Sequence, residues 1–144
     1  MKGWKIAAVV MLVGIQWIPT HPNQGNTDEA KDFLTIYPPP ARIGTLLRTA
    51  CYDCHSNNTD YPWYGRVQPV AMFLESHIEQ GKKELNLNEF GDYSPRRQKS
   101  KLKSMASQIE DGAMPLTSYT LIHRSADLSD QDRRDIKAWI DTKI

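Results

Sequence analysis

The sequence is poor in cysteine and carries no excess of charge of either sign. Cys51 and Cys54 are the only cysteines among 144 residues, and no cysteine lies upstream to take a lipid. Two thiols, without histidines at a paired ligand spacing, disfavour a structural zinc site. Because 18 Lys and Arg nearly balance 17 Asp and Glu, for a net charge of +1, nucleic acid is not expected as a partner. No internal repeat is present.

Long apolar runs are also lacking, except at the N-terminus. Residues 6–18 are almost entirely apolar and follow Lys2 and Lys5, which is the order of an export signal. The run is short for a membrane-spanning helix, which needs about 20 residues. Since no small-x-small cleavage site follows, we expect residues 1–20 to be a signal anchor, with a cleaved signal peptide as the alternative. Either form places the rest of the chain on the periplasmic side of the bacterial inner membrane.

The most specific chemical pattern is Cys51-Tyr52-Asp53-Cys54-His55. C-x-x-C-H is a haem attachment pattern, in which the thiols form thioether bonds to the vinyl groups and the histidine becomes the proximal iron ligand. Positions three and four apart share one face of a helix, so Cys51, Cys54 and His55 can address one flat ligand. The sequence therefore predicts a covalently bound haem c. A thiol-disulfide site is an alternative, but it favours a βαβ setting, and no strand-rich pattern surrounds the cysteines.

A sixth iron ligand is expected further along the chain. Met114 precedes a proline just past the end of a predicted helix, and this rigid backbone suits a thioether that is needed at one position. Met105 is a competitor, although it falls on an apolar stripe where methionine commonly fills gaps. His77, His123 or an open position are the remaining alternatives.

Apolar residues recur at helical spacing in the C-terminal part of the chain. One predicted helix begins at Ala41 and ends at the cysteine motif, a second covers 67–85, a third covers 95–111, and the last begins at Ser129. Ser94 before a proline and Ser129 before Asp132 are helix-start signals. The exposed side of the third helix carries a basic patch that either docks an acidic redox partner or is simply solvated: Arg96, Arg97, Lys99, Lys101 and Lys103.

Residues 21–40 are rich in proline and are predicted to link the N-terminal segment to a domain at 41–144. Pro38, Pro39 and Pro40 cannot join a helix interior and favour an extended conformation. An arm packed on the domain is the alternative for four residues of this stretch: Phe33, Leu34, Ile36 and Tyr37.

The order of these features resembles the class I cytochrome c fold. More narrowly, the chain is similar to the small bacterial haem-binding domain family in four stretches: Cys51–His55, Tyr61-Pro62-Trp63-Tyr64, His77-Ile78-Glu79-Gln80-Gly81 and Met114-Pro115-Leu116-Thr117-Ser118-Tyr119. The resemblance covers about residues 41–144. It implies an all-α fold, with cytochrome c-like helices around one covalently attached haem and an N-terminal hydrophobic anchor helix. His55 is then the proximal ligand and Met114 the distal ligand.

With His55 and Met114 both bound to iron, no position is left for a substrate, and we expect electron transfer with an unidentified redox partner rather than an enzyme. The alternative is a peroxidase-like haem enzyme or a haem-based sensor with an open sixth position. His77, His123 and Arg66 are candidate distal groups for that role, and Arg66 is also a candidate partner for a haem propionate.

Overall fold

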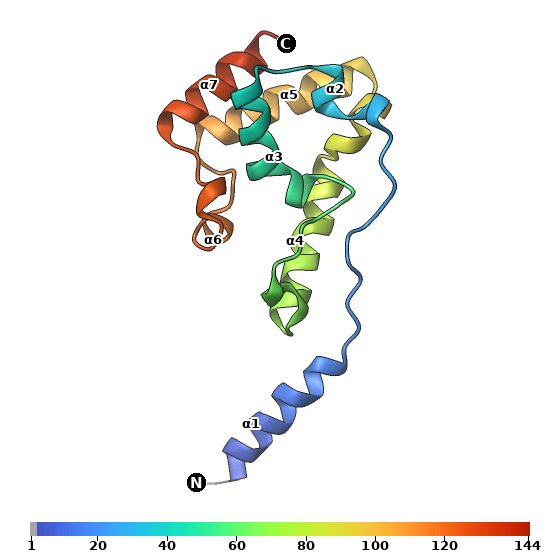
Figure 1. Ribbon diagram of the computed structural model, residues 1–144, viewed down its shortest axis with the longest axis vertical. Helices are drawn as coiled ribbons and strands as arrows, with labels where there is room; N and C mark the ends of the chain where they lie inside the picture. Colours follow the sequence, from blue (N-terminus) through green and yellow to red (C-terminus); the bar gives the residue numbers. More distant parts are fainter. Residues whose placement is uncertain (1–2) are drawn as a thin grey trace.

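The computed structural model describes residues 3–144, so Lys2 of the expected lysine pair lies outside the described residues. Within this range all regular elements are helical, which confirms the all-α prediction (Figure 1). The α-helices are α1 (Gly3–Gly14), α2 (Phe33–Ile36), α3 (Ala41–His55), α4 (Val70–Glu84), α5 (Pro95–Glu110), α6 (Thr117–Thr120) and α7 (Asp130–Asp141). The 3₁₀ helices are η1 (Ile15–Trp17), η2 (Glu29–Lys31), η3 (Trp63–Arg66), η4 (Leu87–Asp92) and η5 (Arg124–Ala126).

Local capping chemistry sets the ends of α5 and α7. The Ser94 hydroxyl accepts a hydrogen bond from the Arg97 N–H at the start of α5. Ser129 and Asp132 form a reciprocal capping box at the start of α7, as their spacing predicted. After α5, Gly112 has a φ of 68°, a left-handed conformation that glycine adopts without steric strain.

The hydrophobic core lies where α3, α5 and α7 meet the short helices α2 and η4 (Figure 1). At its centre, the Phe33 ring lies 4.9 Å from that of Phe90 and 5.7 Å from that of Trp139, measured between centroids. The aliphatic part comes from the inner faces of the long helices: Ile43, Leu47, Leu102, Ile109, Ile136 and Ile140. These side chains hold α3 in a fixed position against α5 and α7.

Part of the expected linker belongs to this core. Phe33 is fully buried, Leu34 is 8% exposed, and Ile36 and Tyr37 pack against the same cluster. Burying such side chains stabilises a fold by about 1.5–3 kcal/mol each, which is enough to hold the segment in place despite its prolines. The packed-arm alternative therefore describes these four residues.

A buried carboxylate joins this arm to α3. Asp32 is 7% exposed, and its oxygens accept hydrogen bonds from the Tyr52 hydroxyl, from Asn88 Nδ2 at 2.8 Å and from the Leu34 N–H at 2.9 Å. The donors come from three different segments of the chain, so Asp32 ties the arm, α3 and η4 together.

We expect Asp32→Ala to lower the free energy of unfolding by about 2–4 kcal/mol, because it leaves buried donors of Tyr52 and Asn88 without an acceptor. Denaturant titration measures this loss. Asp28→Ala is the control, since Asp28 accepts only an exposed capping bond from the Ala30 N–H. Equal losses in the two variants would contradict a structural role for the buried carboxylate.

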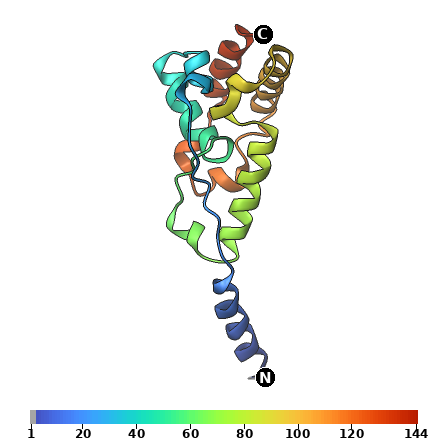
Figure 2. The ribbon, with the colours of Figure 1, turned by 90° about the vertical axis from the view of Figure 1, so that its right-hand side faces the viewer.

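The N-terminal helix differs from the expected anchor helix. α1 has 12 residues and projects from one end of the helical body (Figure 2). The following 3₁₀ helix η1 is joined to that end by reciprocal hydrogen bonds, in which Gln16 Nε2 donates to the Gln68 carbonyl and the Gln68 N–H donates to Gln16 Oε1. Among residues 3–144, none of the helices combines the length and the apolar character needed to cross a membrane. The predicted anchor helix is therefore not supported.

Candidate cofactor site

The structure places the C-x-x-C-H motif at the C-terminal end of α3. The buried face of this helix, with Ile43 and Leu47, packs on the core and holds the last turn at the edge of a cavity. Cys54 and His55 line this cavity, which has a volume of about 470 Å³. Pockets for small molecules and cofactors usually measure about 300–1,000 Å³.

The walls of the cavity come from four parts of the chain that are distant in sequence. They are the last turns of α3, the C-terminal half of α4, the inner face of α5, and the segment from Met114 to Tyr119. Much of the lining is apolar: Ala50, Leu85, Met105, Ile109, Pro115 and Leu116. An apolar slot next to two cysteines and a histidine fits a flat, hydrophobic cofactor such as haem.

The orientation of His55 is fixed by α4. Its Nδ1 lies 2.9 Å from the Gly81 carbonyl oxygen and 3.0 Å from that of Leu85. Because carbonyl oxygens only accept hydrogen bonds, Nδ1 carries the proton, and Nε2 of the neutral ring keeps a free lone pair. Metal-binding histidines almost always donate their other ring N–H in this way. Nε2 of His55 is therefore available as a metal ligand.

Gly81 allows this contact between α3 and α4. A Cβ added to Gly81 would lie only 2.7 Å from the carbonyl oxygen of Cys54 and 3.4 Å from His55 Cε1. A larger residue would force α4 away from the end of α3. The sequence placed Gly81 inside a family-like stretch, but it gave no sign that the glycine touches the cysteine motif.

The two cysteines have different surroundings. Cys54 lines the cavity, whereas Cys51 packs against the hydrophobic core. Burial, together with the neighbouring Cys54, raises the pKa of Cys51 to about 12, and burial together with Asp53 raises that of Cys54 to about 11. Both thiols are thus protonated near neutral pH, whereas redox-active dithiols have lowered pKa values. This disfavours the thiol-disulfide alternative.

Met114 lies in the cavity wall, in the segment between α5 and α6. Its N–H donates to the Gln108 carbonyl at 3.1 Å, and its carbonyl accepts from Arg133 Nη1 at 2.9 Å. These bonds fix the backbone of Met114 between α5 and α7. The cavity thus has His55 and Met114 among its lining residues.

Of the three side chains that compete with Met114 as the sixth ligand, two line the cavity and one does not. Met105 and His77 also line it, but Met105 is 7% exposed and belongs to the core face of α5. His77 Nδ1 is hydrogen-bonded to the Phe73 carbonyl of its own helix. His123 is absent from the lining and is hydrogen-bonded to the Tyr64 hydroxyl instead.

The basic side chain at the cavity is that of Lys101, and not that of Arg66, which the sequence indicated. Arg66 is exposed in η3 and does not line the cavity. Lys101 of α5 does line it, and its Nζ lies 3.7 Å from a carboxylate oxygen of Glu84. Sequence reasoning assigned Lys101 to the exposed side of its helix, because charge patterning alone does not show where a cavity opens.

These features define an all-helical domain with a largely apolar cavity beside a C-x-x-C-H motif, in which His55 can serve as a metal ligand. The family model described as a haem-binding domain matches residues 10–142, and the chain belongs to this family. The match begins upstream of residue 41, in agreement with the packing of the arm on the domain. The family assignment supports haem as the cofactor.

A more distant similarity links the chain to an enzyme. Cytochrome c peroxidase Ccp of Escherichia coli (strain K12) is 29% identical over 103 residues, which cover 68% of this chain and 22% of that relative. The match thus covers about a fifth of the length of the peroxidase. No solved structure matches the chain significantly.

Proposed function

We propose that this protein carries electrons through a covalently bound haem c. Cys51 and Cys54 provide the thioether bonds, His55 is the proximal ligand and Met114 is the distal ligand. The observation that carries the proposal is that the His55 Nδ1–H donates to the carbonyl oxygens of Gly81 and Leu85, so that Nε2 is available as a ligand at a cavity that Met114 also lines.

Each residue has a separate task in this proposal. The carbonyls of Gly81 and Leu85 hold the His55 ring in one tautomer and one orientation. Gln108 and Arg133 hold the Met114 backbone, so the distal side rearranges little when the charge of the site changes. The haem supplies the one-electron chemistry when it is bound. A His/Met ligand pair and an apolar surrounding raise its reduction potential.

The proposal includes export. Residues 1–20 have the charged and then apolar order of an export signal, so we place the domain on the periplasmic side of the inner membrane, held at its surface or released after cleavage. Its partner is then a redox protein of that compartment. Fractionation of cells that carry the full chain tests the location.

Met114→Ala is expected to abolish the methionine-to-iron absorption band of the oxidised protein and to lower the reduction potential, because the thioether favours ferrous iron. The matched control is Met72→Ala, which truncates a methionine that is 44% exposed on α4. Absorption spectra and a redox titration of the holo-protein measure both effects. A band that survives in Met114→Ala would move the assignment to another ligand.

A peroxidase-like enzyme is the second candidate function, and the similarity to the Escherichia coli peroxidase favours it. This role requires an open or weakly held sixth position. A high-spin spectrum of the resting protein, with carbon monoxide or cyanide binding without ligand displacement, would support the enzyme and count against the carrier.

A further inference from the structure

The wall of the cavity on the Met114 side belongs to the segment between α5 and α7, from Met114 to Leu128. Both ends of this segment are held by contacts with the helical body. Its first part is held by the bonds of Met114 to Gln108 and Arg133. Its last part is held by Ala126 and Leu128, which are 1% and 5% exposed. Between these ends lie α6 and the turn that follows it, on the lower left of the helical body in Figure 1.

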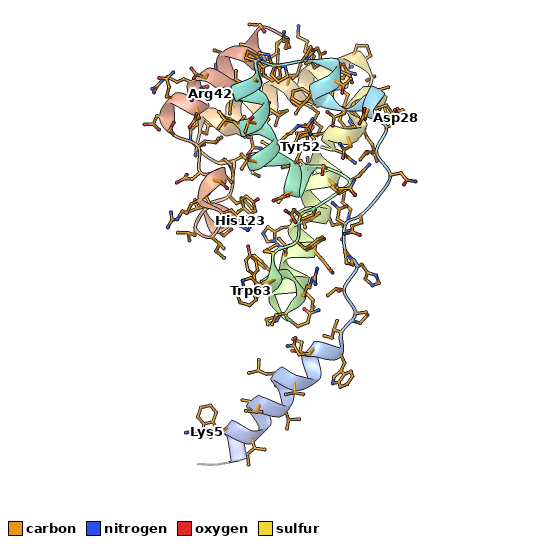
Figure 3. All side chains as sticks on the ribbon, viewed as in Figure 1. Lys5, Asp28, Arg42, Tyr52, Trp63 and His123 are labelled. Carbon is orange, nitrogen blue, oxygen red and sulfur yellow. The ribbon has the colours of Figure 1, made fainter. Side chains whose placement is uncertain are left out.

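Two side-chain hydrogen bonds connect residues 115–125 to other elements in the part of the chain that the structure describes. The Tyr119 hydroxyl donates to Asp53 Oδ2 at 2.6 Å. His123 Nε2 is hydrogen-bonded to the Tyr64 hydroxyl. Figure 3 shows His123 above Trp63, the neighbour of Tyr64. The rings of Tyr119 and His123 stack, with centroids 4.2 Å apart and an interplanar angle of 12°, so the two bonds support each other.

The bond between Tyr119 and Asp53 joins the two sides of the cavity. Asp53 lies inside the Cys51–His55 motif, whereas Tyr119 and Met114 both belong to the opposite wall. Burial and the contact with Asp53 raise the pKa of Tyr119 above its ordinary value, so the hydroxyl stays protonated and donates. A donor to a carboxylate forms a charge-assisted bond, which is stronger than a neutral one.

We propose that the Asp53–Tyr119 hydrogen bond is a clasp that keeps the Met114 wall closed and so controls the access of small ligands to the iron. Tyr119 is a positioning residue, and the pair Tyr64–His123 supports it. The inference rests on the proposed ligation by Met114. It assigns a role to Asp53, the second of the two variable residues of this C-x-x-C-H motif, and to Tyr119 of the opposite wall.

The test is the rate at which cyanide binds to the oxidised, full-length holo-protein. Tyr119→Phe removes only the hydroxyl, and we expect cyanide to bind about tenfold faster, since a hydrogen bond to a charged group contributes about one power of ten or more to an equilibrium. The control is Tyr61→Phe, which removes a hydroxyl that accepts from the Asn23 N–H at 2.8 Å and has no place in the cavity wall. Its cyanide rate is expected to match that of the wild type.

Tyr64→Phe is the second variant, and we expect a smaller acceleration because it removes the supporting bond only. Asp32→Ala is the control for a general loss of stability, because this variant is expected to be less stable without losing the clasp. Its rate of cyanide binding is expected to equal that of the wild type. Wild-type cyanide rates in both Tyr119→Phe and Tyr64→Phe would overturn the clasp, even if unfolding became easier. An absent methionine-to-iron band in the wild type would instead sink the proposed ligation, and the clasp with it.

Discussion

Replacing both Cys51 and Cys54 by alanine is expected to release the haem completely from covalent attachment. Each thioether bond needs one of these thiols, and the chain contains no other cysteine. The wild-type haem should stay with the polypeptide in a denaturing gel and in acidified organic solvent. The haem of the double variant should pass entirely into the solvent, because only the iron ligands hold it.

The single variant Cys51→Ala is the matched control, since Cys54 still lines the cavity and can form one bond. It should keep the haem attached, with a mass and a pyridine-haem spectrum that report one thioether. Extraction of haem from the wild-type protein would contradict covalent binding. That result would leave the family's haem binding intact but remove the c-type assignment.

Gly81→Ala is expected to lower the free energy of unfolding by about 2 kcal/mol, because overpacking costs about 1–3 kcal/mol and the better helix propensity of alanine offsets at most about 1 kcal/mol. The added Cβ would meet the Cys54 carbonyl oxygen at 2.7 Å, and a backbone oxygen inside a helix cannot swing away. The Gly81 carbonyl would also move away from His55 Nδ1. Denaturant titration measures the stability, and the absorption spectrum of the holo-protein reports the displaced histidine.

Gly14→Ala is the matched control for Gly81→Ala. An added Cβ at Gly14 has no heavy atom within 4 Å, so the substitution should leave stability unchanged or raise it by up to about 1 kcal/mol. Similar effects at the two glycines would show that Gly81 is not needed for the contact between α3 and α4.

The features that the sequence predicted correctly are those with a local cause. The start of α5 follows from Ser94 and the start of α7 from the capping box of Ser129 and Asp132, because these signals involve residues three positions apart. The apolar period before Cys51 placed the cysteine motif at the end of a helix. Periodicity also located the buried face of α5, including Met105.

The features that it missed depend on contacts between distant residues. The sequence left open whether Phe33 is part of a linker or of a packed arm, because it lies five residues before three consecutive prolines, and only the tertiary position of Phe90 and Trp139 explains its burial. The partners of His55 Nδ1 are backbone carbonyls, which every residue possesses, so no side-chain pattern marks them. The bond between Asp53 and Tyr119 is invisible for the same reason of distance.

The packing of Cys51 against the core has a consequence for how the protein is made. Cys51 is partly buried between the core and the end of α3, whereas Cys54 faces the cavity. Under the proposed covalent attachment, a bulky macrocycle would reach Cys51 more easily before the helices have packed around it. We therefore propose that attachment precedes the final packing of the core, so that maturation and folding are coupled.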